Sequence, residues 1–249
     1  KQEQEKSNRL LLNVLPASVA DELKENGSVA PRAWDCVTVL FTDFQGFTGI
    51  SQSTTAQDLV AELDHWFSAF DGIATKHGLE KIKTIGDSYM ACAGIPAGNS
   101  ADAVDAVLAA LEIQACVKGH TCAGSGGAQA PWRLRIGIHT GPLVAGVIGK
   151  SKFIYDVFGD TVNTARRFES SGEADRINIS RATYDIVQPF FTCSYRGKVT
   201  AKGKGEMDMY FVERIAPELS QDSEGRVPNE AFAAQRRLRV QALDTALAD

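Results

Sequence analysis

The stretch "VTVLFTDFQGFT", residues 37–48, joins an apolar run to a single carboxylate and a glycine turn. The run from Val37 to Phe41 is typical of a buried strand. The strand ends at Asp43, and Gly46 permits a tight turn whose backbone N–H groups could hold phosphate oxygens. We therefore predict a strand over residues 36–43 that presents an acid at the edge of a sheet.

Segments with the spacing of helices and of strands alternate along the rest of the chain. We expect, in order, a helix over 54–78, a hairpin around Gly86-Asp87, a helix over 100–119, a second hairpin over 132–149, a helix from 160, a short strand over 176–180, a short helix over 181–189 and closing strands over 191–215. This order predicts an α+β fold built on a βαββαβ core, with helices packed on an antiparallel-rich sheet.

The expected organisation has three parts. Residues 1–34 form a linker and signalling-helix region, with a helix capped by Ser18 and stopped by Gly27. The first 16 residues fit either the end of a coiled coil or a frayed helix. Residues 35–215 form the main domain, and residues 216–249 form a polar tail with a peripheral helix.

The composition narrows the class of function. The chain has 249 residues, 44% of them hydrophobic, and a net charge of −5, which argues against nucleic acid as a partner. Five cysteines without a CxxC pair indicate a reducing compartment, so we expect a cytoplasmic domain. No apolar run is long enough for a membrane span. Because the sequence begins with Lys, we expect a piece of a longer protein, and the helix at its start indicates an upstream sensor.

Two aspartates define the predicted chemistry. Asp87 lies at the tip of the first hairpin, and in a βαββ unit that hairpin neighbours the first strand, which ends at Asp43. Both acids can then project from one edge of the sheet as ligands for Mg²⁺ or Mn²⁺. The alternative is that Asp43 only caps a helix and Asp87 only forms a turn.

Five motifs resemble those of the class III nucleotidyl cyclases, in the order and spacing of that family. They are "FTDFQGFT", "KIKTIGDSYM", "RIGIHTGPLVAGVIG", "FGDTVNTARRFES" and "KGKG", and the resemblance covers residues 35–215. It implies a βαββαβ palm-like sandwich that works as a head-to-tail homodimer, with active sites at the interface.

The resemblance also implies roles for individual residues. Asp43, Asp87 and the carbonyl of Phe44 would hold two Mg²⁺ or Mn²⁺ ions per site, although the family usually has Ile where this sequence has Phe44. Asn163 would orient the ribose, and Arg167 would meet the charge on the α-phosphate. Lys202 would bind the terminal phosphates, and Gly46, Phe47 and Thr48 form the predicted phosphate loop.

Lys83 and Asp156 match the positions that read the purine in the family. Lysine only donates hydrogen bonds and an ionised aspartate only accepts them, which suits the N1 acceptor and 6-amino donor of adenine. We therefore predict an adenylate cyclase that converts ATP to cyclic AMP and pyrophosphate. The alternatives are a guanylate cyclase and a catalytically inactive module that dimerises or binds nucleotide.

Overall fold

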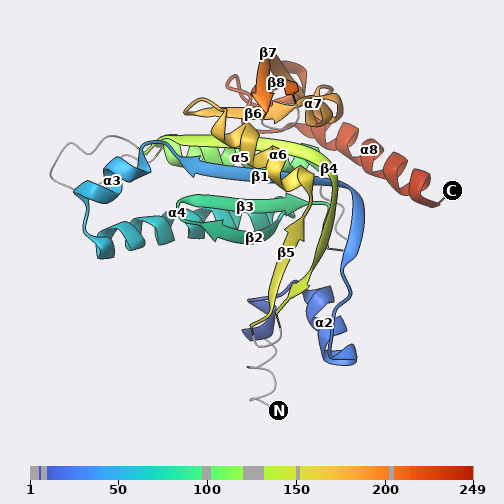
Figure 1. Cartoon of the computed structure of the whole chain (residues 1–249). Coiled ribbons are helices and arrows are strands. Elements are labelled where there is room, and N and C mark those ends of the chain that lie inside the picture. Colours follow the sequence, from blue (N-terminus) through green and yellow to red (C-terminus); the bar gives the residue numbers. More distant parts are fainter. Residues whose placement is uncertain are drawn as a thin grey trace.

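The protein forms one mixed sheet with helices on both faces. The computed structural model describes residues 6, 10–96, 102–119, 132–149, 152–201 and 205–248. Within these ranges the strand order is β2-β3-β1-β4-β6-β8-β7, and β5 pairs with β4 beside this path (Figure 1). The strands are β1 (Arg32–Phe44), β2 (Glu80–Ile85), β3 (Ser88–Ala93), β4 (Leu134–Ile148), β5 (Ile154–Phe158), β6 (Arg176–Ser180), β7 (Phe191–Ala201) and β8 (Gly205–Ile215).

The helices connect these strands in the predicted order. They are α2 (Ala17–Asn26), α3 (Phe47–Ser53), α4 (Ala56–Lys76), α5 (Ala103–Gly119), α6 (Asp160–Ser170), α7 (Arg181–Val187), the 3-10 helix η1 (Pro217–Leu219) and α8 (Glu230–Ala248). β1 pairs antiparallel with both β3 and β4, while α4 and α5 provide the two crossovers. The predicted α+β fold with a βαββαβ core is confirmed.

The prediction of a second hairpin over residues 132–149 was wrong. This segment is one strand, β4, and Gly141-Pro142 lies inside it rather than at a turn. Gly141 pairs with Val37 and Leu143 pairs with Trp34, so Pro142 falls where the register of β1 shifts. Proline is tolerated at such a bulge because no ladder hydrogen bond is required of it there. The hairpin is instead formed by β4 with β5.

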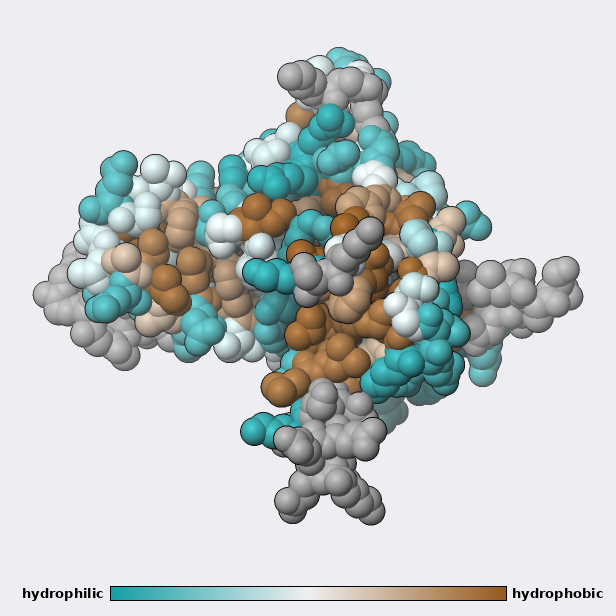
Figure 2. Space-filling model, turned by 60° about the horizontal axis from the view of Figure 1, so that its bottom comes forward, coloured by the Kyte–Doolittle hydropathy of each residue, from teal (hydrophilic) through white to brown (hydrophobic). Residues whose placement is uncertain are grey.

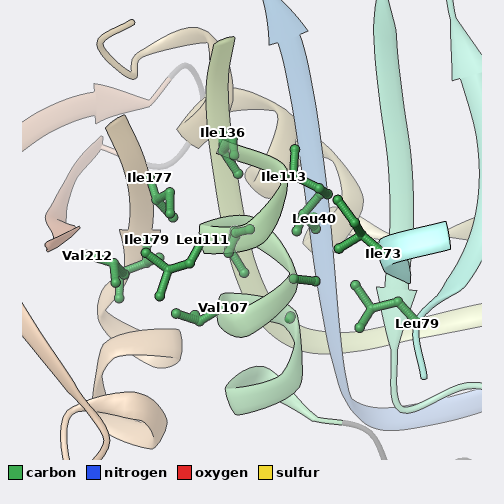
Figure 3. Close-up of a cluster of buried hydrophobic side chains, with 14 of the residues drawn as sticks. Leu40, Ile73, Leu79, Val107, Leu111, Ile113, Ile136, Ile177, Ile179 and Val212 are labelled. Atoms are coloured by element: carbon green, nitrogen blue, oxygen red, sulfur yellow. The ribbon is translucent and has the colours of Figure 1, made fainter. Parts of the chain in front are cut away.

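Each face of the sheet carries its own hydrophobic core. Leu40, Ile136 and Ile138 point to the face covered by α4, α5 and α7, and Figure 3 shows these strands packed around α5. Val39 and Phe41, which alternate with Leu40, point to the other face, where they meet α2 and α6. The acid at position 43 continues this second series and therefore lies on the α6 face.

Two glycines in β4 allow α6 to lie directly on the sheet. A Cβ on Gly137 would lie 2.0 Å from the backbone nitrogen of Glu169, and one on Gly141 would lie 2.7 Å from Oγ1 of Thr161. Such contacts are far inside van der Waals distance, so only glycine permits this approach. These two glycines therefore set how closely α6 approaches β4.

The terminal segments differ in part from expectation. α2 begins after Pro16, which makes no side-chain cap, so the predicted cap at Ser18 was wrong, while the stop at Gly27 is confirmed. The peripheral helix is α8, which buries Phe232 against Phe190 and Phe191. In the described part of the chain no helix is long and apolar enough to cross a membrane.

Candidate active site

Asp43 lies at the end of β1, where two neighbouring strands provide partners for its carboxylate. Thr42 pairs with Tyr89, which brings the next residues, Asp43 and Ser88, side by side. Ser88 Oγ donates a hydrogen bond to Oδ1 of Asp43 at 2.9 Å. On the other side, Arg135 of β4 donates to Oδ2 at 2.5 Å. The carboxylate is therefore held in one orientation at the end of β1, between β3 and β4.

Asp87 lies in the turn between β2 and β3, and its side chain meets that of Asp43. Burial raises the pKa of Asp87, and the charge of Asp43 and a hydrogen bond with its carboxyl raise it further. The backbone N–H groups of Phe44 and Asp87 itself donate to the Asp87 carboxyl and oppose this shift. Asp87 thus lies near Asp43, at the end of β1.

This pair suits a divalent cation. Two partly buried carboxylates repel each other, and after burial, which is the larger cause, the charge of Asp43 adds to the rise in the pKa of Asp87. A hard cation with oxygen ligands would relieve it. Among the described residues no group of three or more acidic, histidine or cysteine side chains is arranged to hold a metal ion, so carbonyl, water and substrate oxygens would supply the remaining ligands.

Two further charged residues belong to this end of the site, and neither was predicted. The Arg135 guanidinium that contacts Asp43 also lies 3.0 Å from Oε1 of Glu169 on α6. Glu169 is 4% exposed, and burial, followed by the charge of Asp43, raises its pKa to about 7. The contacts of Arg135 depend on the register that places it opposite Asp43 and on the packing of α6. Strand alternation alone could only have assigned Arg135 to the α6 face.

The predicted phosphate loop, Gly46 to Thr48, follows the end of β1 in the chain. Gly46 has φ +78° and precedes α3, whose first residues are Phe47 and Thr48. The first amides of a helix have no intrahelical partner, so these N–H groups can meet an anion. The preceding residue, Gln45, donates its N–H to the carbonyl of Arg133 at 2.8 Å, which ties the loop to the start of β4.

The side chain of Phe44 points the other way, into the aromatic core. It is 1% exposed, and its ring lies edge-on to Trp132 with 4.8 Å between centroids. Its backbone nevertheless stays at the site, since its N–H donates to Asp87. The phenylalanine therefore alters the packing under the site without removing a main-chain ligand.

The structure also brings together Lys83 and Asp156, which are 73 residues apart. Lys83 Nζ on β2 donates to Oδ2 of Asp156 on β5 at 2.5 Å. Their side chains are 37% and 14% exposed, so the pair is accessible to a ligand. Oδ1 of Asp156 accepts the N–H of Val157 at 2.9 Å, which orients the carboxylate.

The remaining predicted residues lie on or near α6. Asn163 is exposed and Arg167 is half-buried, four residues apart on one helix face. In the described part of the chain neither side chain has a hydrogen bond or ion pair that would occupy it. Lys202, the predicted phosphate lysine, lies outside the described residues.

Comparison with known proteins decides the family. Residues 29–214 match the family model of the adenylate and guanylate cyclase catalytic domain. The chain belongs to the class III nucleotidyl cyclases. This confirms the family resemblance of the five motifs.

Relatives within the cyclase family act on different nucleotides. The chain is 40% identical over 225 residues to guanylate cyclase 32E of Drosophila melanogaster, covering 89% of this chain and 19% of the relative. It is also 40% identical over 214 residues to an adenylate cyclase of Mycobacterium tuberculosis, covering 84% of this chain and 47% of the relative. The chain thus spans less than half the length of these relatives, and identity alone does not separate ATP from GTP.

The solved structures that resemble this chain also include both adenylyl and guanylyl cyclases. The adenylyl cyclase CyaB from P. aeruginosa has a TM-score of 0.71 and 30% identity, over 77% of this chain and 100% of that one. The guanylate cyclase domain of RhGC from Catenaria anguillulae, in complex with GTP, has a TM-score of 0.67 and 37% identity, over 73% and 97%. Both share the fold of this cyclase domain.

Proposed function

We propose that this cyclase domain is an adenylate cyclase that converts ATP to 3′,5′-cyclic AMP and pyrophosphate. The observation that carries the proposal is the contact between Lys83 and Asp156, 2.5 Å from Nζ to Oδ2. The ammonium donates to N1 of adenine and the carboxylate accepts from the 6-amino group. Guanine presents the opposite pattern, so GTP would leave both polar groups mismatched.

The residues around the acids would bind and orient the reacting groups. Asp43, Asp87 and the Phe44 carbonyl would hold two Mg²⁺ or Mn²⁺ ions, which lower the pKa of the ribose 3′-hydroxyl and offset phosphate charge when bound. Asn163 orients the ribose and Arg167 meets the charge on the α-phosphate. The 3′-oxygen forms a bond to the α-phosphorus while the bond to the β-phosphate oxygen breaks, and pyrophosphate leaves.

The terminal phosphates need their own partners. In the proposal these are Lys202 and the amides of Gly46, Phe47 and Thr48, at the turn where α3 begins. Arg135 contacts Asp43 close to this end of the site, so its positive charge would also act on a bound phosphate.

We further propose that the active unit is a head-to-tail homodimer. Lys83 and Asp87 are four residues apart, yet one reads the base and the other binds at the phosphates, so each chain contributes to two sites. An exposed apolar area supports this proposal, and Figure 2 shows apolar residues gathered on the face that carries the β4–β5 hairpin. Its members on the hairpin strands are Val144, Ile148, Ile154 and Phe158, which are 38% to 55% exposed.

Mixing two inactive variants tests the shared site. Asp43→Ala removes a residue of the acid end and Arg167→Ala removes a residue of α6, so each variant alone should make almost no cyclic AMP from ATP with Mn²⁺. Because half of randomly mixed dimers are heterodimers with one intact site, the mixture should regain about a quarter of the unmodified activity.

Three results would count against the proposal. Absence of recovery in mixtures that do exchange subunits would contradict the shared site. Absence of ATP turnover in the unmodified protein would instead favour an inactive module. The presence of the acids, the base-reading pair and the α6 residues in one chain argues against such a module. A preference for GTP would favour the guanylate alternative.

A further inference from the structure

Asp175, in the turn before β6, adopts a conformation that is unusual for its residue type. Its φ is +61°, the only positive value for a residue other than glycine in the described part of the chain. Aspartate tolerates the left-handed region better than most residues, but the conformation is still unfavourable. Surrounding contacts must therefore hold the turn in place.

Asp175 holds the start of β4 with both its backbone and its side chain. Its N–H donates to the carbonyl of Leu134 at 2.7 Å. Its carboxylate accepts from Nε of Arg133 at 2.8 Å and from the N–H of Leu134 at 3.4 Å. Three hydrogen bonds from one residue thus fix the first residues of this strand.

Those residues are the ones that touch the metal end of the site. The carbonyl of Arg133 accepts the N–H of Gln45, two residues beyond Asp43, at 2.8 Å. The guanidinium of Arg135, on the other side of Leu134, contacts Asp43 itself. A shift of the β4 start would therefore move both the phosphate loop and the partner of the first metal-binding acid.

The turn that contains Asp175 also contacts α5, and through α5 it is linked to the C-terminal segment. Gln114 is 5% exposed and donates to the carbonyl of Asp175 at 2.8 Å. Its Oε1 accepts from Arg226 at 3.3 Å, a residue that lies beyond the range matched by the family model. Gln114 therefore links the Asp175 turn to a segment that lies beyond the residues matched by the family model.

We propose that Asp175 is a positioning residue for the cyclase reaction. Its hydrogen bonds go to α5 and the start of β4 rather than to Asp43 or Asp87, and it acts by holding the Arg133–Arg135 segment against the loop that carries Asp43 and Gln45. The inference rests on the proposed function for its effect on turnover, but its effect on the loop is independent of turnover.

Two substitutions separate the side chain from the backbone conformation. Asp175→Gly keeps access to positive φ and removes the carboxylate, whereas Asp175→Asn keeps an acceptor oxygen and a tolerance of this conformation. The matched control is Asp185→Ala, which removes an exposed carboxylate paired with Arg181 on α7. All three are made in the full chain, and thermal midpoints are recorded.

Three readouts are compared: hydrogen–deuterium exchange of the peptide that contains Gln45, Mn²⁺ binding followed by electron paramagnetic resonance of the free ion, and turnover of ATP. In Asp175→Gly we expect faster exchange confined to this peptide and the β4 start. We also expect Mn²⁺ binding to weaken, or the rate of ATP turnover to fall, by about 10- to 100-fold. This is the usual loss when a residue that orients metal ligands is removed. Asp175→Asn keeps one of the two acceptor oxygens and loses the charge that pairs with Arg133, so it should lie between Asp175→Gly and the unmodified protein. Asp185→Ala should match the unmodified protein.

Unchanged exchange at Gln45 and unchanged Mn²⁺ binding in Asp175→Gly would overturn the inference. So would faster exchange spread evenly over all peptides together with a lower thermal midpoint, since that result marks a purely structural role. If the unmodified protein turned over no nucleotide, the proposed function would fail, while exchange and Mn²⁺ binding would still decide the role of Asp175.

Discussion

The double substitution Lys83→Glu with Asp156→Cys tests how the purine is read. In the structure the two side chains meet at 2.5 Å and present one donor and one acceptor to a ligand. The double variant presents an acceptor on β2 and removes the acceptor on β5, which suits the N1–H and O6 of guanine. Preference should therefore move from ATP toward GTP.

The size of the effect follows from the contacts. A matched pair of polar contacts discriminates between bases by about 1–3 kcal/mol. At about 1.4 kcal/mol for each factor of ten, the ratio of kcat/KM for ATP to that for GTP should fall about 5- to 150-fold. Lys83→Glu alone places a second carboxylate against Asp156, which is 14% exposed, and their repulsion disfavours both nucleotides. The double variant should thus use GTP better than this single variant, a non-additive result.

The assay measures kcat/KM for ATP and GTP with Mn²⁺, with cyclic AMP and cyclic GMP separated by chromatography. Lys81→Glu is the matched control, because it makes the same charge change on β2 at a lysine that pairs with Asp71 instead. Its ratio of ATP to GTP use should equal that of the unmodified protein. The reasoning is refuted if the double variant folds, turns over nucleotide and keeps the original ratio.

Three other predictions follow from the site and its packing. Asp43→Ala should abolish turnover with either Mg²⁺ or Mn²⁺ and keep the circular dichroism spectrum of the folded protein; near-normal turnover would remove the metal role. Burial raises the pKa of Glu169 from 4.5 to about 7, so the folded state retains a proton that the unfolded state has released. The free energy of unfolding should then fall as pH rises from about 4.5 to 7, and Glu169→Gln should flatten this slope in urea titrations; an unchanged slope would contradict the assignment. Gly137→Ala should displace α6 and lower the thermal midpoint, since its Cβ would lie 2.0 Å from the Glu169 nitrogen. The control Gly72→Ala places a Cβ where no atom lies within 4 Å, so its thermal midpoint should match that of the unmodified protein. Equal tolerance of both substitutions would show that the close packing of α6 is not required.

Local patterns were sufficient to predict most of the fold. Strand alternation and helical spacing identified the βαββαβ core, because each element has an apolar face that matches its own period. The error in β4 arose at Gly141-Pro142, which is a turn signal in isolation. It lies inside the strand because β1 extends back to Arg32 and pairs across it. Long-range pairing of this kind is not encoded in the residues of the segment itself.

The site was predictable where its residues belong to family motifs, and incomplete where it depends on register. Asp43, Lys83 and Asp87 lie in quoted motifs, and Asp156 lies two residues before another. The structure brings Lys83 and Asp156 into contact and places Asp87 near Asp43. Arg135 and Glu169 were missed because their contacts require β1 and β4 in register and α6 packed on Gly137. Asp175 was missed for the same reason, since its partners come from β4 and α5.

The most direct test of the account is turnover of ATP and GTP, each with Mg²⁺ and with Mn²⁺, by the unmodified chain. We predict cyclic AMP as the main product, with kcat/KM for ATP above that for GTP under both metals. A higher kcat/KM for GTP would contradict the role given to Lys83 and Asp156, and no product from either nucleotide would contradict the proposed catalysis.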